Sequence, residues 1–358
     1  MSTLQNAHAR GTAPIATALI RQQPEDFQVQ EQCPVAFADT GEHLWLYIEK
    51  SALTTQQVVA WLAAAADVAR RDIGLSGLKD RHAVTRQWFS MPWPMRREQM
   101  FRPAPQALDP LPADSRLQIL QQRRHTRKLR RGTHAANAFD LTLRRVTGPP
   151  DAIETDLQRI RRHGVPNYFG PQRFGRDGGN LELARALFAG RRLRRNKRGF
   201  ALSAARSFLF NAVLDARVRE QSWNRTLPGE AVMLDGSHSI FSAAEESETE
   251  LQRRLQAFDI HPSGPLPGRA AAGIVDGEAL ALENEVLAAH QELVDGLLAC
   301  RVEAARRALR LVVRDLHWHW SAPDCLHLRF TLPTGSFATA VLREVVHYAS
   351  PRKNHTHA

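Results

Sequence analysis

The sequence predicts an α+β fold in which a mainly antiparallel sheet is interrupted by a helix-rich segment. Segments with the two-residue apolar period of strands occupy the first part of the chain and return at 311–332. Between them, from 153 to 310, most segments have the apolar period of helices. Strands and helices do not alternate regularly, so βαβ units are not expected. Because domain termini often lie close together, we expect an inserted domain, with boundaries at 1–162, 163–310 and 311–358.

Length and charge narrow the class of protein. A chain of 358 residues is longer than one core usually grows, and 43% hydrophobic residues suffice for two. Lysine and arginine total 48 against 37 acidic residues, and the formal net charge is +11. This excess favours a polyanionic partner, but it does not distinguish RNA, DNA and an acidic membrane.

Cysteine usage and the N-terminal segment indicate the compartment. The cysteines Cys33, Cys300 and Cys325 form no CxxC pair, so neither a disulfide framework nor a cysteine zinc site is supported. The apolar run at 13–20 is too short to span a membrane and lacks the pattern of a signal peptide. We therefore expect a cytoplasmic protein without a membrane partner.

The first strand-rich part begins with a turn at Pro24. After it, Phe27, Val29 and Glu31 share one face of an expected strand. A second strand is predicted at 43–50, where apolar and polar residues alternate.

A helix follows the second strand. Thr54 and Gln57 have the spacing of a capping box, and the alanine-rich run continues to Arg70. The proline-rich stretch at 92–112 has no period and is predicted to be a loop. Strands are expected at 117–120 and 137–146.

The most informative stretch is 75–90, LSGLKDRHAVTRQWFS. It predicts a strand, a glycine-containing turn and a second strand, with Asp80 at the tip between Lys79 and Arg81. Neighbouring cations favour the ionised carboxylate, which a nucleophile or a base requires. A solvated charged turn is the alternative interpretation.

The middle of the chain is predicted to be mainly helical. A helix at 153–163 ends at the expected C-cap Gly164. Asn180 is expected to cap a helix that runs to Gly190, and Ser203 to begin a long helix.

Later segments return to strand character. A hairpin is expected around 234–238, and a Gly/Pro-rich loop at 262–268. Strands at 311–320 and 326–332 are then followed by a helix at 336–346.

Several common catalytic motifs are missing from the sequence. It contains no GxGxxG after a strand, no GxxxxGK[ST] and no HExxH, which leaves dinucleotide, P-loop and zincin sites without their motifs. His317 and His319 lack a third ligand, so no metal site is predicted. Basic runs at 123–131 and 191–198 instead suggest contacts with phosphates, although such runs are often only solvated faces.

Six blocks of sequence carry a family resemblance. They are RQQPEDFQVQE (21–31), GLKDRHAVTRQW (77–88), RKLRRGTHAANAF (127–139), GVPNYFGPQRFG (164–175), NKRGFALSAARSFLFN (196–211) and LPTGSFATAVLRE (332–344). In this order they resemble the tRNA pseudouridine synthase D family over nearly the whole chain. The resemblance implies a pseudouridine-synthase catalytic domain that is interrupted by an insertion domain.

The resemblance also implies an activity and a site. It implies isomerisation of uridine to pseudouridine in transfer RNA, at uridine-13, with Asp80 as the catalytic residue. The expected substrate-binding residues are Phe27, Asn137, Phe337, Arg21, Lys79, Phe139 and Arg173. Arg21 stands where lysine is expected in the family. We expect Asp80 at the floor of an apolar, arginine-rimmed crevice that holds one extruded nucleoside.

The implied reaction has no net redox change and adds no water, so no cofactor or metal is expected. The predicted partner is transfer RNA, with no dedicated protein partner, and the chain is expected to be a monomer. Two alternatives stay open from the residues alone: a non-catalytic RNA-binding protein, and a glycosidase that hydrolyses the base from the ribose.

Overall fold

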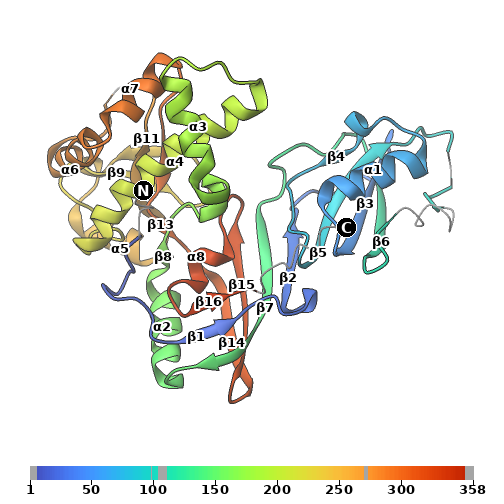
Figure 1. Cartoon of the computed structure of the whole chain (residues 1–358), viewed down its shortest axis with the longest axis horizontal. Coiled ribbons are helices and arrows are strands. Elements are labelled where there is room, and N and C mark those ends of the chain that lie inside the picture. The colour runs from blue at the N-terminus through green and yellow to red at the C-terminus, as the bar shows by residue number, and fades with distance from the viewer. Residues whose placement is uncertain (1–5, 98, 104–110, 270–272, 351–358) are drawn as a thin grey trace. The chain divides into compact units, whose positions relative to one another are not determined.

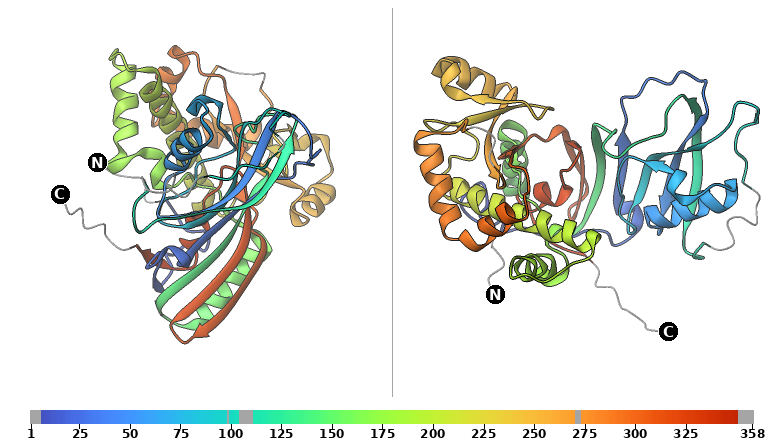
Figure 2. Two further views of the ribbon diagram at one scale, coloured as in Figure 1. Left: turned by 90° about the vertical axis from the view of Figure 1, so that its right-hand side faces the viewer. Right: turned by 90° about the horizontal axis from the view of Figure 1, so that it is seen from above.

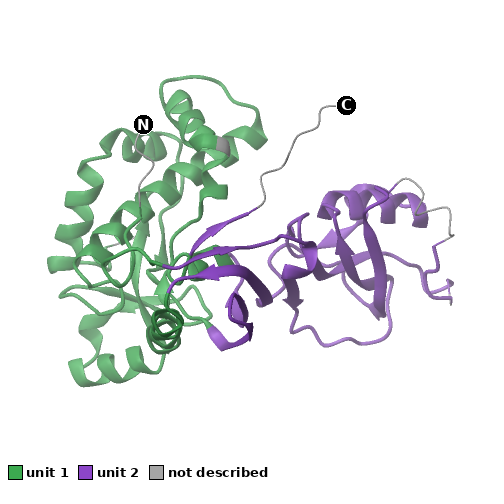
Figure 3. Cartoon of the chain, turned by 60° about the horizontal axis from the view of Figure 1, so that its bottom comes forward, with its two compact units in different colours: residues 1–15, 149–313, 336–346 green, residues 16–148, 314–335, 347–358 purple. Residues whose placement is uncertain are grey.

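The computed structural model describes residues 6–97, 99–103, 111–269 and 273–350 (Figure 1). The chain divides into two compact units that are interleaved along the sequence (Figure 3). Unit 1 comprises 1–15, 149–313 and 336–346, and unit 2 comprises 16–148, 314–335 and 347–358.

Unit 2 is built on one large sheet. Its strands are β1 (Thr17–Leu19), β2 (Phe27–Gln32), β3 (His43–Ser51), β4 (Gly74–Leu75), β5 (Val84–Pro92), β6 (Arg116–His125), β7 (Ala136–Thr147), β14 (Arg314–Ala322), β15 (Cys325–Pro333) and β16 (His347–Ala349). The main order is β14-β15-β7-β2-β5-β3-β6. All recorded pairings are antiparallel except β1 with β16 and β2 with β5. The late hairpin β14–β15 thus extends the sheet next to β7 (Figure 2).

One helix closes the core of unit 2. Helix α1 (Thr55–Ala66) places Val58 and Leu62 against Leu44 and Leu46 of β3, and all four are fully buried. Short 3-10 turns are η1 (Pro24–Asp26) and η2 (Arg70–Asp72). The alternation at 43–50 therefore reflects one face of β3 packed on α1, while Trp45 on its other face is buried in a second cluster with Trp88 and Leu129.

The predicted elements of this part are mostly confirmed. Thr54 is the N-cap of α1 and forms the predicted capping box with Gln57. The helix ends at Ala66, four residues before the predicted end, because Asp67 adopts a left-handed conformation. The described residues between Pro92 and Arg116 form neither a helix nor a strand, as predicted for 92–112, and 98 and 104–110 lie outside the described residues.

Unit 1 contains the remaining elements. Its helices are α2 (Pro150–His163), α3 (Gly179–Phe188), α4 (Arg195–Arg219), α5 (Glu248–Gln256), α6 (Gly277–Ala288), α7 (Gln291–Ala299) and α8 (Ala338–Leu342), with 3-10 turns η4 (Pro171–Phe174), η5 (Arg176–Gly178) and η6 (Ala243–Glu245). Its strands are β8 (Val165–Pro166), β9 (Ala231–Leu234), β10 (Ile240–Ser242), β11 (Ile260–Leu266), β12 (Ala305–Ala308) and β13 (Arg310–Leu311). They form a sheet of order β10-β9-β11-β12 and the pair β13-β8.

Three predictions for unit 1 are wrong. Helix α4 begins at Arg195, so Ser203 lies inside it, where its hydroxyl accepts a hydrogen bond from Arg173. Residues 260–266 form β11 instead of a loop; one half of β11 pairs with β9 and the other with β12, an arrangement that tolerates prolines. Asn180 is not a cap, because its amide instead donates to the carbonyl of Arg173.

The helix predicted at 336–346 is shorter in the structure. Helix α8 spans only Ala338–Leu342, and Phe337 is its N-cap. Among the helices that the structure describes, none has the length and apolar character needed to cross a bilayer.

Candidate active site

Asp80 lies in the loop between β4 and β5, and buried side chains of unit 2 hold the backbone of that loop. The ammonium of Lys50 donates to the carbonyls of Asp80 and Leu53, both at 2.7 Å. The hydroxyl of Thr55 accepts from the Lys79 amide at 2.9 Å, and Gln87 Nε2 donates to the Gly77 carbonyl at 3.0 Å. The loop is therefore fixed to β3, α1 and β5 at successive points.

The cation next to the Asp80 carboxylate comes from a distant part of the sequence. A guanidinium nitrogen of Arg21 lies 3.0 Å from Asp80 Oδ2, and the same guanidinium covers the ring of Phe27, 4.0 Å from its centroid. Arg81, adjacent in sequence, instead donates to the Ala52 carbonyl. The prediction that Lys79 and Arg81 flank the carboxylate is therefore wrong, because chain neighbours point in different directions from this turn.

The carboxylate is more accessible than predicted. The Asp80 side chain is 39% exposed and that of Arg21 is 23% exposed. Unit 2 therefore does not enclose Asp80 at the floor of a crevice. The pair forms part of an open surface that a ligand can reach.

An aromatic row lines the same face of the sheet as Phe27. Phe27 and Phe139 meet edge to face, with ring centroids 6.3 Å apart, and Phe139 stacks on Phe330 at 5.3 Å. The strand register puts them on one face: Val29 of β2 pairs with Phe139 of β7, and Phe330 of β15 pairs with Phe139 from the other side. These rings supply flat apolar surface beside the arginine–aspartate pair.

A buried ion pair underlies the loop. Lys79 Nζ lies 2.8 Å from Glu31 Oε2, and the two side chains are 6% and 0% exposed. Burial raises the pKa of the Glu31 carboxyl, and the charge of Lys79 opposes that shift. Lys79, predicted to bind substrate, thus directs its ammonium into the interior of unit 2.

Asn137 and His134 adjoin this ion pair. Asn137 pairs with Glu31 across β7 and β2, and its Nδ2 lies 3.5 Å from His134 Nε2. His134 Nδ1 is 2.5 Å from the Ser76 hydroxyl. Within the described part of the chain, the buried Oδ1 of Asn137 and Oε1 of Glu31 have no hydrogen-bond partner. Both oxygens are therefore candidates to accept a hydrogen bond from a ligand or a water molecule.

His134 is expected to make unit 2 sensitive to acid. Burial, with the charge of Lys79 second, lowers its pKa from 6.5 to about 4, so its contribution to stability is complete above pH 6.5 and is lost as the pH falls through 4. The loss should be on the order of 2–3 kcal/mol. Glu31, whose pKa is raised, takes up its proton earlier in the folded state and opposes the effect.

The measurement is urea unfolding at several pH values, followed by tryptophan fluorescence, since all tryptophans except Trp223 lie in unit 2. Comparison with His134→Gln isolates the histidine from Glu31. A stability difference between the two proteins that is the same at pH 7 and pH 4 would contradict the assignment of a neutral, buried histidine.

Two predicted site residues belong to unit 1. Phe337 precedes α8, and Arg173 lies in η4 with its guanidinium 5.1 Å from the centroid of Phe169. They are outside the cluster that unit 2 forms from Arg21, Phe27, Lys79, Asp80, Asn137 and Phe139.

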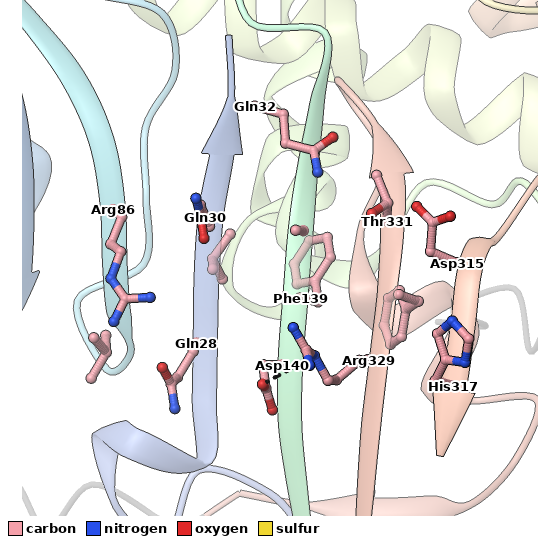
Figure 4. A pocket seen from close by; sticks show the side chains of 14 residues that line it. Gln28, Gln30, Gln32, Arg86, Phe139, Asp140, Asp315, His317, Arg329 and Thr331 are labelled. Carbon is pink, nitrogen blue, oxygen red and sulfur yellow. Dashed lines mark ion pairs between the residues drawn. The ribbon is translucent and has the colours of Figure 1, made fainter.

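A hollow lies on the face of the unit 2 sheet opposite to the aromatic row. This hollow of about 440 Å³ is lined mainly by polar residues, including Gln28, Gln30 and Arg86, and the intervening residues Phe139 and Phe330 also border it (Figure 4). Asp140 and Arg329 pair across it at 3.5 Å, and His317 lies at its edge. Because side chains alternate along strands, Gln28 and Asp140 project from the face of the sheet opposite to that of the Phe27 and Phe139 side chains. In the described ranges, no group of three or more residues that could hold a metal ion occurs.

Several residues that hold the Asp80 loop in place were not predicted, although the sequence pattern could have indicated two of them. Lys50 continues the series of alternate residues in 43–50 that carries Leu44, Leu46 and Ile48, and Glu31 continues the face of Phe27 and Val29. A charged residue in such a buried series indicates a buried polar interaction. Thr55, Gln87 and His134 gave no comparable signal.

Comparisons with known proteins identify the family to which the chain is similar. Residues 7–190 and 183–345 match the family described as tRNA pseudouridine synthase D. The chain is 45% identical over 339 residues to the tRNA pseudouridine synthase D of Nitrosococcus oceani, covering 94% of this chain and 92% of that protein. It is also 45% identical over 331 residues to that of Methylococcus capsulatus, covering 92% and 91%.

The chain belongs to the tRNA pseudouridine synthase D family. A crystal structure of the putative family member from Methanosarcina mazei matches with a TM-score of 0.70 at 22% identity, covering 95% of this chain and 96% of that one. The predicted fold class, an α+β pseudouridine-synthase fold with a mainly antiparallel sheet, is thereby confirmed. Arg21, which departs from the lysine expected in the family, still places a cation beside Asp80.

Proposed function

We propose that this chain converts uridine-13 of transfer RNA to pseudouridine, with Asp80 as the catalytic carboxylate. Membership of the family makes the chain a tRNA pseudouridine synthase, which is an isomerase. The observation that carries the assignment of Asp80 is its geometry. An exposed carboxylate on a firmly held loop is paired with Arg21 beside a row of aromatic rings.

The reaction requires one carboxylate from the protein. The bond from N1 of uracil to C1′ of ribose breaks, the base turns, and a bond from C5 to C1′ forms; the proton leaves C5 and N1 gains one. Asp80 acts either as a nucleophile at C1′ or as a base at C2′. Neither route changes the oxidation state or adds water overall, so we expect no cofactor.

The surrounding residues fit a flipped uridine. Phe27 and Phe139 offer aromatic surface for stacking, which offsets the cost of extruding a base. A substrate-binding role for Phe337, which belongs to unit 1, stays a prediction. Asn137 has an unpartnered Oδ1 that suits an N–H of the uracil edge. Arg21 holds the carboxylate in place through an ion pair at 3.0 Å. Lys79 does not face the proposed substrate; its ion pair with the buried Glu31 stabilises the loop that carries Asp80.

The RNA contacts are proposed to come from basic surfaces. In the run 191–198, every residue except Leu193 is exposed. In the run 123–131, Arg124 is buried, leaving the exposed Arg127, Arg130 and Arg131 to face a polyanion. The domain boundaries at 162 and 310, a cytoplasmic location, the monomeric state and the lack of a protein partner stay predictions.

The function is tested with transfer RNA that carries tritium at C5 of uracil. An isomerase releases tritium at one uridine and leaves the RNA mass unchanged apart from that exchange, with modification mapped to position 13. A glycosidase would instead leave an abasic site, and a non-catalytic RNA-binding protein would release nothing. Either of these results would reject the proposal.

Lys50 should act as a positioning residue for Asp80. We expect Lys50→Met to lower kcat by about 10- to 100-fold and to change KM little, because a loop displaced by about 1 Å misplaces the carboxylate. Steady-state kinetics with transfer RNA provide the measurement. Arg86→Met is the control, because Arg86 pairs with Glu49 on the opposite face of the sheet. A larger effect on KM than on kcat would argue for RNA contact instead.

A further inference from the structure

Three arginines in unit 1 differ from most of the buried arginines around them. Arg173 in η4, Arg206 in α4 and Arg307 in β12 are each half-buried, and among the residues that the structure describes none of them lies within 4.0 Å of a carboxylate. Nearby arginines in the same unit are paired, as Arg217 is with Glu230 and Arg306 is with Glu283. The unit therefore neutralises some of its enclosed arginines and leaves these three without a counter-charge.

Two of the three share one aromatic ring. The guanidinium carbons of Arg307 and Arg173 lie 4.3 Å and 5.1 Å from the centroid of Phe169. Phe169 is itself fixed, because its amide and carbonyl both bond the side chain of Asn211 at 2.9 Å. The ring thus holds two positive groups close together at a defined place.

The hydrogen-bond acceptors around the cluster are neutral. Arg307 donates to Asn167 Oδ1 at 2.6 Å, and Arg173 donates to the Ser203 hydroxyl at 3.0 Å. Arg206, one helical turn after Ser203, donates to the backbone carbonyls of Leu266 and Glu303. These bonds orient the three guanidiniums and use only some of the N–H donors that each one carries.

Enclosing three guanidinium groups without an anion costs folding free energy. Like charges repel, and each of the three arginines has a buried Nε with no acceptor among the described residues. Burial lowers the pKa of all three, and that of Arg307 to about 10. A guanidinium does not lose its proton at neutral pH in proteins, so the three positive charges stay. Cation–π contact with Phe169 offsets part of the cost. An anion placed between the guanidiniums would offset much of the rest.

We propose that Arg173, Arg206 and Arg307 form a binding site for one phosphodiester group of the RNA substrate. Guanidinium groups match the oxygens of a phosphate through paired, charge-assisted hydrogen bonds. A fixed cluster of this kind differs from the exposed run at 191–198, which attracts RNA without holding a particular phosphate. The proposal rests on the proposed function, because that function supplies RNA as the anion.

The test measures transfer RNA affinity as a function of salt for Arg173→Gln, Arg206→Gln and the double variant. Loss of one phosphate contact should reduce the slope of log affinity against log salt by about 0.7–0.9 in the double variant. We expect affinity near 0.1 M salt to fall roughly 5- to 10-fold. Arg185→Gln, which removes an exposed arginine paired with Glu182, should leave the slope unchanged.

Further measurements separate loss of a phosphate contact from misfolding and from binding of free phosphate. Circular dichroism and thermal unfolding establish that each variant is folded, and Arg173→Lys, which keeps the charge, should retain most of the slope. Phosphorus NMR with inorganic phosphate alone tests whether the site takes free phosphate. A folded double variant with an unchanged slope overturns the proposal, and phosphate binding in that case would assign the cluster to a free anion.

The affinity measurement does not depend on turnover. It can be made in an Asp80→Asn background, so failure of the isomerase assignment and failure of the phosphate site are separate results. If the chain bound RNA without modifying it, the salt slopes would still report on the three arginines.

Discussion

Replacing Asp80 by asparagine is expected to abolish tritium release from C5-labelled transfer RNA, with turnover reduced by about a thousandfold or more. Asparagine has nearly the same shape, so the loop held by Lys50, Thr55 and Gln87 should keep its conformation. The amide, however, can neither attack C1′ nor remove a proton from C2′. RNA affinity should stay within a few-fold, because the proposed phosphate contacts do not involve this carboxylate.

Asp140→Asn is the matched control for this substitution. Asp140 is also in unit 2 and also lies near an arginine, Arg329, but it faces the hollow on the other side of the sheet (Figure 4). Its replacement should leave turnover within about twofold, because surface pairs of this kind contribute little. Equal activity of Asp80→Asn and the native protein would remove the aspartate from the mechanism, and equal loss in both variants would point to a general effect of acidic residues.

The same assay can separate the two routes open to Asp80. Transfer RNA with deuterium at C2′ of the target uridine should react more slowly if the carboxylate removes that proton. A nucleophilic attack on C1′ leaves the C2′–H bond intact and predicts no primary isotope effect. The geometry of Asp80 and Arg21 is compatible with both, since an arginine partner stabilises the carboxylate in either role.

The sheet of unit 2 was predictable because its strands are amphipathic. The alternation in β2, β3, β7 and β15 is the direct result of one face packing on a core, so each strand could be found locally. Residues whose structure depends on distant partners could not be found in this way. The start of α4 at Arg195 is an example, since a run of arginines has no apolar period to mark a helix.

The same distinction applies to the candidate site. Asp80 stands out in the sequence because it lies in a charged turn between two strands, and the family resemblance points to the same residue. Its surroundings do not stand out, because Arg21 and Lys50 reach it from strands and loops separated by 30 residues or more along the chain. Strand register alone brings Glu31 opposite Asn137. The local sequence therefore identifies Asp80, whereas the residues that hold it in place are brought to it only by the tertiary fold.

The second large effect is expected at the buried pair beneath the loop. Lys79→Met should destabilise unit 2 by about 3–5 kcal/mol, because it leaves the fully buried Glu31 carboxylate without its partner. Chemical unfolding followed by tryptophan fluorescence measures this loss. The partly exposed pair of Arg86 and Glu49 provides a comparison within the same sheet, and Arg86→Met should cost less than about 1 kcal/mol.

The double variant Glu31→Gln/Lys79→Met distinguishes support from substrate binding. If Lys79 acts through Glu31, removing both charges should restore most of the stability, because neutral side chains of similar volume replace a buried ion pair at little cost. RNA affinity should then stay within a few-fold of the native value. If Lys79 instead contacts RNA, the double variant would be stable but would bind transfer RNA weakly, with a smaller salt slope. That result would return Lys79 to the substrate-binding residues that the sequence first suggested.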